Sequence, residues 1–363
     1  MKILHIINSL ATGGAEKLLL DTIPLYNKKL IQCDLLVFHE INCPFMNLLK
    51  DKKCCKIFNL HFKSVYNPVI IFKIIPYLKQ YDIVHVHLFP AQYWVVLAKI
   101  LSFSKVKLIF TEHSTSNRRL KNKFFRVFDL IIYFHYKKII CITKNVKNEL
   151  LSKLKLNYNK LIIIQNGVEL DSIYQSKPYL KEDIIPGIFN NDNLLIQIGG
   201  FRIEKDQITT IKSLLHLENN VKLILVGIGI LENKCKLLVK NLNLEQRVFF
   251  LGLRMDIPSL LKTADISIVS SHWEGFGLVA VEGMASGKPV IASDVDGLNY
   301  VVSGGGILFE KGNAKKLAEI ITKLFEDEIL FNQTVKNCKI KALEYDINKM
   351  IDNTIDLYKI LNN

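Results

Sequence analysis

Short apolar runs alternate along this chain with longer segments of helical periodicity. In the first half, helical patterns such as 68–81 and 91–102 separate most of these runs. Apolar runs of this length that are joined by helices are typical of a parallel sheet whose strands are buried on both faces. The predicted strands cover residues 3–10, 34–39, 56–62, 83–88, 108–112, 139–143 and 161–165. The pattern therefore predicts a doubly wound α/β sheet for this half.

The same alternation returns in the second half. Apolar runs begin at positions 194, 221, 248, 264 and 289, and the segment 169–193 before them is rich in Pro, Asn and Asp. A chain of 363 residues is long enough for two domains of ordinary size. We therefore predict a first domain over 1–175, a linker, and a second domain over 190–345.

The two halves differ in charge. Residues 1–180 hold 27 Lys and Arg against 11 Asp and Glu, whereas residues 181–363 hold 21 against 23. The net charge of +14 therefore comes from the first half. A one-sided basic domain indicates an anionic partner, which is a membrane surface, a nucleic acid or an acidic acceptor.

Compartment follows from the start of the chain and from its cysteines. The apolar start is interrupted by His5 and Asn8, so we interpret it as a first strand of a cytoplasmic protein rather than a signal peptide. No apolar run approaches the ~18 residues of a membrane span. The seven cysteines are odd in number and lack paired metal-ligand spacing, which indicates reduced thiols rather than a disulfide framework.

Two carboxylates, Glu274 and Glu282, lie eight residues apart across a predicted strand–loop–helix junction. Gly275 and Gly277 between them allow the backbone to approach a ligand closely. The start of the predicted helix 278–286 offers free N–H groups to an anion. A ligand that is anionic at one end and rich in hydroxyls at the other, such as a nucleotide-sugar, fits this layout.

The sequence Glu-Gly-Phe-Gly-Leu at 274–278, with Glu282, resembles the glutamate–seven–glutamate motif of retaining glycosyltransferases with the GT-B fold, family 4 in particular. The resemblance implies two Rossmann-like domains facing a cleft, with the donor on the second and the acceptor on the first. It implies that a last helix within 346–363 crosses back to the first domain, and that Glu282 holds the nucleotide ribose. The donor-sugar loop would consist of Glu274, Gly275, Phe276, Gly277 and Leu278.

Several other positions suit a diphosphate or a nucleotide. A Gly pair at 199–200 precedes Arg202 and Lys205, two cations beside a predicted helix start. The resemblance places these cations on the donor pyrophosphate. Gly13 and Gly14 form a phosphate-compatible turn that lacks the third glycine of the dinucleotide fingerprint, and the resemblance places them under the diphosphate. Leu253 and Arg254 are implied to border the base, mostly through backbone atoms.

Histidines follow two predicted strands. His85 and His87 lie on one face of a strand, and we expect no third metal ligand nearby. The resemblance places His113 beside the donor sugar and leaving phosphate; a donor contact and a structural role stay open for His87, and His85 is interpreted as structural. Asp294 and Asp296 have the spacing of a metal-binding pair. We reject a metal site there, because the resemblance is to GT-B enzymes, which work without such a pair. We therefore expect no metal and no cofactor, the nucleotide-sugar being a substrate.

The segment 118–134 joins five basic residues to a dense apolar helix. It is either a basic loop followed by a core helix, or an interfacial segment that docks on anionic lipid. The cationic positions before and within the helix are Arg118, Arg119, Lys121, Lys123 and Arg126. We expect peripheral attachment at the inner face of the cytoplasmic membrane.

The resulting hypothesis is a retaining glycosyltransferase that moves a hexose or N-acetylhexosamine from a nucleotide-diphosphate sugar to a lipid-linked or saccharide acceptor in surface polysaccharide synthesis. A UDP-sugar is favoured and GDP-mannose stays possible. Tyr300 stands where the family has a glutamate, so sugar preference is not carried over. Two alternatives stay open, a nucleotide-sugar epimerase of the same fold and a basic nucleic-acid-binding protein. The second lacks a helix-turn-helix, zinc or stacking motif, so we expect no nucleic acid as partner.

Overall fold

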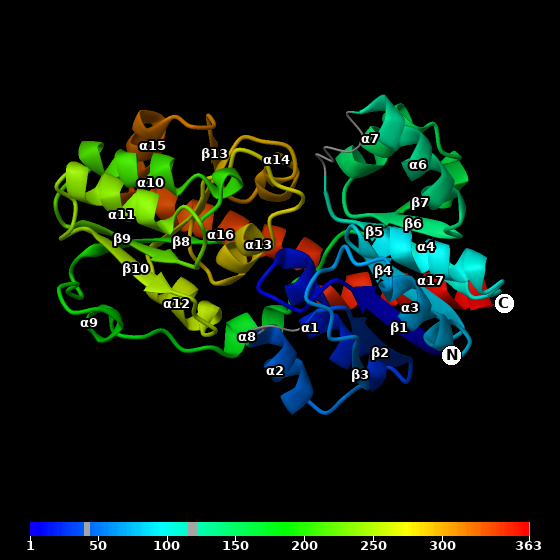
Figure 1. Cartoon of the computed structure of the whole chain (residues 1–363). Coiled ribbons are helices and arrows are strands. Elements are labelled where there is room, and N and C mark those ends of the chain that lie inside the picture. Colours follow the sequence, from blue (N-terminus) through cyan, green and yellow to red (C-terminus); the bar gives the residue numbers. More distant parts are fainter. Residues whose placement is uncertain (40–43, 115–121, 363) are drawn as a thin grey trace. The chain divides into compact units, whose positions relative to one another are not determined.

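The computed structural model describes residues 1–39, 44–114 and 122–362. The chain divides into two compact units, Met1–Gly167 with Ile347–Asn363, and Val168–Asp346. Each unit is built on one parallel sheet with helices packed against it (Figure 1). This architecture confirms the predicted α/β class with two doubly wound, Rossmann-like sheets.

The first unit holds a seven-stranded sheet in the order β3-β2-β1-β4-β5-β6-β7. Its strands are β1 Lys2–Ile7, β2 Gln32–Val37, β3 Ile57–Asn59, β4 Ile83–His87, β5 Lys107–Glu112, β6 Lys138–Cys141 and β7 Leu161–Ile163. Its helices are α1 Gly14–Lys28, α2 Pro44–Asp51, α3 Ile70–Leu78, α4 Ala91–Leu101, α6 Lys123–Phe134, α7 Lys144–Leu154 and α17 Ile347–Asn362, with a short 3-10 turn at Tyr158–Lys160.

One face of this sheet is covered by α1, α2 and the C-terminal helix α17. Side chains of alternate strand residues, such as Ile3, Ile7 and Ile83, join Ile23 of α1 and Ile351 of α17 in one buried cluster. The helix α17 comes from the end of the chain, yet it completes the core of the first unit. The polar positions of the same strand face are therefore enclosed as well.

The second unit holds a six-stranded sheet in the order β10-β9-β8-β11-β12-β13. Its strands are β8 Asn193–Ile198, β9 Val221–Val226, β10 Val248–Gly252, β11 Ile266–Val269, β12 Val290–Ser293 and β13 Ile307–Phe309. Its helices are α8 Leu170–Gln175, α9 Lys181–Ile184, α10 Gln207–Ser213, α11 Glu232–Asn241, α12 Ile257–Thr263, α13 Leu278–Ala285, α14 Leu298–Val302, α15 Ala314–Glu326 and α16 Glu328–Ala342. Short 3-10 turns lie at Ile203–Lys205, Leu214–His216 and Leu343–Tyr345.

Several strands end earlier than the apolar pattern predicts. The run 161–165 gives only Leu161–Ile163, although Ile164 just beyond it is buried. Likewise, β2 ends at Val37 whereas Phe38 is fully buried. Apolar character reports burial rather than strand pairing, so it extends into loops that leave the sheet inside the core.

The strand order reverses once in each sheet. In the first unit β1 lies between β2 and β4, and in the second β8 lies between β9 and β11. The loops that leave the carboxyl ends of the central pair run to opposite faces, which creates the crevice where ligands bind in open α/β sheets. The chemistry of each unit is therefore expected at the ends of β1 and β4, and of β8 and β11.

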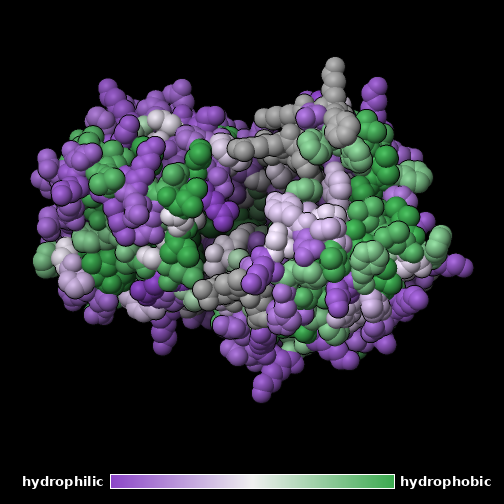
Figure 2. All heavy atoms as spheres, viewed as in Figure 1, coloured by the Kyte–Doolittle hydropathy of each residue, from purple (hydrophilic) through white to green (hydrophobic). Residues whose placement is uncertain are grey.

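Among the described residues, no helix combines the length and the apolarity that a membrane crossing would require. Hydrophobic side chains nevertheless reach the surface over α4 and α6 in the first unit (Figure 2). The six cysteines of the described ranges are free thiols.

We predict that α17 contributes to stability through its buried stripe. Replacing Ile351, which is fully buried, with Ala should lower the free energy of unfolding by about 2–4 kcal/mol, because the cavity cannot fully collapse. Replacing Ile360 on the same helix, which is 69% exposed, should change it by less than about 0.5 kcal/mol. Urea unfolding of both variants measures the difference, and equal effects would contradict the packing of α17.

Candidate active site

In the second unit, the loops that follow β8 and β11 are neighbours because the two strands pair. Gln197, the residue before the last one of β8, connects these loops through its side-chain amide. That amide donates to the carbonyl oxygen of Lys205 at 2.7 Å and to that of Ser270 at 3.4 Å. The sheet therefore holds the predicted phosphate loop and the predicted sugar loop together at its carboxyl edge.

The two loops also meet through an ion pair between Lys205 and Glu274. Lys205 Nζ lies 2.6 Å from Glu274 Oε2, and the two side chains are only 24% and 17% exposed. A charge-assisted bond in a partly desolvated place holds both groups in one geometry. Lys205, the cation predicted to bind the diphosphate, is thus paired in this structure with Glu274, the acid predicted to bind the sugar.

Asp206 connects the end of the predicted phosphate loop to the start of α10. Its backbone is left-handed, with φ of 41°, and it caps α10 by accepting from Thr209 N at 3.3 Å and Thr209 Oγ1 at 2.6 Å. Ser270 Oγ donates to the same carboxylate at 3.4 Å. This buried residue was absent from the predicted site; an Asp placed three residues before Thr209 at a helix start is the capping signal that could have found it.

Glycines let the sugar loop pack backbone to backbone. Gly277, at the start of α13, has φ of 89°, and a Cβ there would lie 2.4 Å from Leu298 Cδ2. Gly297 has φ of 88°, and a Cβ there would lie 2.4 Å from the carbonyl oxygen of Glu274. Gly277 has no side chain that could accept a hydrogen bond from the first N–H groups of α13. These N–H groups therefore suit an anion.

The remaining predicted residues of this unit differ in exposure. Glu282 is half-buried in α13, and Phe276 is buried with its ring edge-to-face on Tyr345 at 5.4 Å. The Phe276 side chain therefore packs into the unit, and a ligand would meet its backbone. Gly275 and Leu278 are partly exposed beside it.

Arg202 and the segment of Leu253 and Arg254 lie on different loops. The Arg202 side chain is exposed and lies 4.0 Å from Glu204. Arg254 Nε donates to Asp256 at 2.8 Å, and this bond helps to lower the pKa of Asp256 to about 2. The Arg254 side chain is thus bonded to Asp256. The groups that remain for the predicted contact with the base are the backbone of this segment and the partly exposed Leu253.

In the first unit, the predicted phosphate turn caps α1. Gly13 is the residue before the helix and Gly14 its first residue. The Glu16 carboxylate lies over this turn, since a Cβ on Gly13 would be 2.2 Å from Glu16 Oε2. A diphosphate at this helix start would have to displace that carboxylate. Of the basic positions before α6, Arg118, Arg119 and Lys121 lie outside the described residues.

Histidines form the polar centre of the first unit. His5 Nδ1 lies 3.1 Å from His87 Nε2, and His87 Nδ1 lies 3.1 Å from His113 Nε2. His85 is bonded elsewhere, with Nε2 at 2.7 Å from Thr111 Oγ1 and Nδ1 at 2.5 Å from Tyr358 OH. His87, the last residue of β4, therefore connects the predicted site residue His113 with His5 in the core.

Burial keeps these imidazoles neutral. It lowers the pKa of His5 to about 3 and that of His113 to about 4. The pKa values of His85 and His87 are lowered well below the ordinary value, first by burial and then by the neighbouring histidines. At neutral pH each ring thus carries one N–H and one lone pair.

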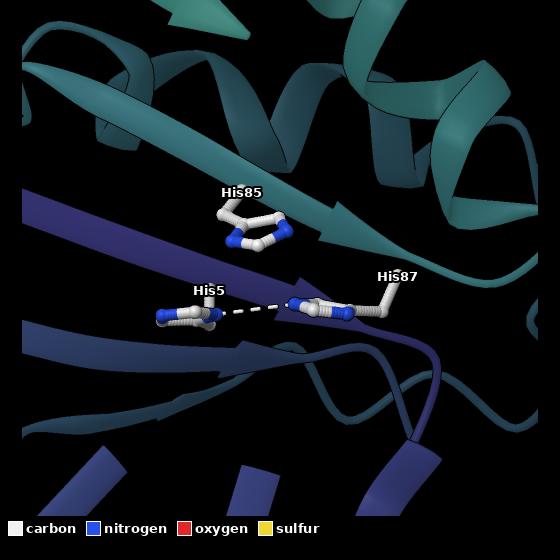
Figure 3. A group of neighbouring side chains, drawn as sticks. All are labelled: His5, His85 and His87. Atoms are coloured by element: carbon white, nitrogen blue, oxygen red, sulfur yellow. Dashed lines mark hydrogen bonds between the residues drawn. The ribbon is translucent and has the colours of Figure 1, made fainter. Parts of the chain in front are cut away.

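The expectation of no third ligand beside His85 and His87 is wrong. His5 has a nitrogen within 4.8 Å of nitrogens of both (Figure 3). The expectation failed because His5 lies far away in sequence and becomes the register partner of His85 only when β1 pairs with β4. Its place on the same strand face as Ile3 and Ile7 was the available signal.

Comparison with known proteins places both units in one class of enzyme. Residues 12–172 match the model of Glycosyltransferase Family 4, and residues 181–342 match that of Glycosyl transferases group 1. An uncharacterized glycosyltransferase of Methanocaldococcus jannaschii is 32% identical over 286 residues, 77% of this chain and 76% of that protein.

Two further proteins are similar over most of their length. The UDP-Gal:alpha-D-GlcNAc-diphosphoundecaprenol alpha-1,3-galactosyltransferase of Escherichia coli is 29% identical over 297 residues, 77% of this chain and 76% of that protein. The Anabaena protein HepE, solved in complex with UDP-glucose, superposes with a TM-score of 0.87 at 22% identity and covers 99% of both chains.

We predict that the buried histidines make stability depend on pH. The unfolded chain protonates them below about pH 6.5, whereas the folded chain does so only at much lower pH, so stability is complete above pH 6.5 and falls as the pH falls. Between pH 7.5 and 5, His5 alone should cost about 2 kcal/mol, and His85 and His87 should add to it. Urea unfolding at a series of pH values measures this slope; equal stability at pH 5 and 7.5 would contradict neutral burial.

Proposed function

The chain belongs to the family 4 glycosyltransferases of the GT-B fold, and from this premise we propose that it is a retaining enzyme that transfers a hexose or N-acetylhexosamine from a UDP-sugar to a lipid-linked acceptor in surface polysaccharide synthesis. The family and the fold are established by the matches over both units. The donor, the stereochemistry and the acceptor are the parts that we propose.

The observation that carries the proposal is the Lys205–Glu274 pair at the switch point of the second sheet. A cation whose side chain lies beside Gly199 and pairs with Glu274, shortly before α13, suits the diphosphate of a donor. When a diphosphate takes over Lys205, the Glu274 carboxylate is released toward the sugar hydroxyls. The ion pair thus keeps both groups in place before the donor arrives, and the donor supplies the partners for both.

The proposed step breaks the bond between the anomeric carbon and the diphosphate oxygen and forms a bond to the acceptor oxygen on the same face. The leaving UDP takes the acceptor proton, and no covalent sugar–enzyme bond forms. Negative charge grows on the diphosphate, where Lys205, Arg202 and the N–H groups of α13 would stabilise it. Because these groups supply the positive charge, we propose that the reaction needs no metal.

Donor and acceptor are proposed from the similar proteins. The E. coli relative is named for a UDP-galactose donor and a diphosphoundecaprenol-linked acceptor. HepE, with the same fold, was solved with UDP-glucose. A basic first unit that binds a lipid-linked diphosphate agrees with the charge of residues 1–180.

Attachment to a membrane is proposed from the exposed face of α6. Asp129, the acidic residue of this helix, is buried and accepts a hydrogen bond from Tyr93 OH at 2.6 Å. The apolar side chains that reach solvent on α6 include Phe134, which is 73% exposed, together with Phe125, Val127, Phe128, Leu130 and Ile131. An apolar helix face without exposed acid suits an interfacial position on a bilayer.

Cations gather at the end of this helix. Lys160 Nζ donates to the Phe134 carbonyl oxygen at 2.6 Å, and its charge helps to lower the pKa of His135, after burial and Lys99. The pKa values of Lys99 and Lys160 are themselves lowered, by burial and then by Lys137. Mutual repulsion of these cations would be relieved by anionic lipid headgroups. We therefore propose peripheral attachment at the inner face of the cytoplasmic membrane.

The donor site is tested by nucleotide binding. UDP at a hundred times its dissociation constant should stabilise the protein by about 2.7 kcal/mol in thermal unfolding, with or without chelator. The shift should be lost in Glu282→Ala, which removes the proposed ribose contact, and retained in Glu319→Ala, a glutamate of α15 that is half exposed and pairs with Lys316. GDP, ADP, GDP-mannose and NAD complete the panel. Stabilisation by NAD alone, or by no nucleotide, would contradict the proposal.

The membrane face is tested with vesicles that contain roughly one third anionic lipid. The combined substitutions Val127→Ser, Ile131→Ser and Phe134→Ser should weaken vesicle binding by about 10-fold or more, because apolar area is removed from the interface. The matched control replaces three exposed apolar residues of the second unit, Ile230, Leu237 and Ile329, with Ser and should bind as wild type. Binding of the α6 variant at wild-type strength would refute the membrane role.

A further inference from the structure

Three imidazoles form a hydrogen-bonded line across the carboxyl edge of the first sheet. His5 belongs to β1, His87 ends β4, and His113 follows β5, and both N–N distances along the line are 3.1 Å. A neutral imidazole donates through one nitrogen and accepts through the other. The direction of one bond in the line therefore sets the direction of the other, and the tautomer of His113 depends on what happens at His5.

Two buried polar atoms lie at the inner end of the line. Among the described residues, neither His5 Nε2 nor Asn166 Oδ1 has a hydrogen-bond partner, and both atoms are buried. Both residues line the same cavity of about 10 Å³, which is room for about one water molecule. The other lining residues include Tyr26, Thr22 and Thr354, so the cavity has a partly polar wall.

A single water can satisfy both atoms in two arrangements: it gives one proton to each, or it gives one to Asn166 Oδ1 and accepts one from a protonated His5 Nε2. The first arrangement uses both protons of the water on these two buried atoms, whereas the second uses only one of them. The Asn166 oxygen can only accept, and a water has two protons to give. If it gives one to Asn166 and the other to His5 Nε2, both buried acceptors are satisfied at once. His5 then carries its proton on Nδ1 and donates to His87 Nε2, and His87 Nδ1 donates to His113 Nε2.

We propose that His5 and His87 are positioning residues that hold His113 as its Nδ1–H tautomer, so that His113 presents a hydrogen-bond donor to its ligand. His113 is partly exposed, and its Nδ1 has no hydrogen-bond partner within the part of the chain that the structure describes. A donor N–H fits an oxygen that gains negative charge, such as the oxygen between sugar and phosphate. The ligand rests on the proposed function, whereas the tautomer does not.

The same histidines could be taken for a metal site, but their rings do not converge. His5 and His87 direct their nitrogens at each other (Figure 3). Both nitrogens of His85 are within hydrogen-bond distance of hydroxyl groups, those of Thr111 and Tyr358. The His85 ring stacks on that of His87 at 4.4 Å with 29° between planes. Lone pairs lie in the ring planes, so two rings that stack face to face cannot both aim at one ion. The geometry thus favours a hydrogen-bonded line over a zinc centre.

The first test reads the tautomers directly. Long-range proton–nitrogen NMR spectra of the full chain with labelled histidine rings distinguish Nδ1–H from Nε2–H, and single-residue variants assign the signals. We expect the Nδ1–H form for His5, His87 and His113. An Nε2–H form at His113 would overturn the proposal, as would one equivalent of zinc retained after dialysis and lost in His5→Asn.

The second test changes the middle of the line. His87→Asn keeps an amide N–H near the position of the imidazole Nδ1, whereas His87→Leu removes it. We expect His87→Leu to release the His113 tautomer and to lower kcat about 3- to 10-fold with little change in KM, and His87→Asn to restore both. The control His85→Gln changes the same strand face outside the line and should leave the His113 tautomer as in wild type.

Thermal unfolding first confirms that each variant is folded. An unchanged His113 tautomer in a folded His87→Leu variant would overturn the positioning role. If wild type shows the Nδ1–H form but transfers no sugar from any donor, the proposed function fails while the tautomer assignment stands. The two failures are thereby distinguished.

Discussion

Parallel alignment of every strand is the constraint from which the chemistry of this protein follows. Because all strands of a sheet point the same way, their carboxyl ends meet at one edge, and the reversal of strand order brings two loops together there. In the second unit this reversal puts Lys205 next to Glu274, 69 positions later. In the first unit it puts His5 next to His85 and His87. Neither constellation exists in any local segment of the chain.

The two edges differ in how they treat charge. At the second sheet, a cation and an acid form an ion pair, which is costly in a partly desolvated place unless the geometry is good, and the 2.6 Å contact provides that geometry. At the first sheet, burial keeps four imidazoles neutral, so they orient protons without carrying charge. A diphosphate needs fixed positive charge and a sugar needs directed hydrogen bonds. The proposed function assigns the first task to Lys205 and the second to the released Glu274.

What could be predicted from sequence was local. The alternation of apolar runs and helices revealed both sheets, and the spacing of Glu274 and Glu282 around Gly277 marked the loop before α13. Contacts between distant segments could not be read in this way. The Gln197 bridge and the Asp206 cap support the site through residues that no motif names, and His5 gained its neighbours only through strand pairing. Arg254 was predicted near the base, but its side chain is held by Asp256, a pairing that depends on loop conformation.

The proposed function depends most on Lys205, which we propose binds the second phosphate of the donor nucleotide. The most direct measurement is calorimetric titration of UDP and UMP into wild type and Lys205→Ala, with Lys212→Ala, an exposed lysine of α10, as the matched control. We expect wild type to bind UDP more tightly than UMP by about 1.5–3 kcal/mol, and we expect Lys205→Ala to lose this advantage while Lys212→Ala keeps it. An equal advantage for UDP in wild type and Lys205→Ala would contradict the proposal.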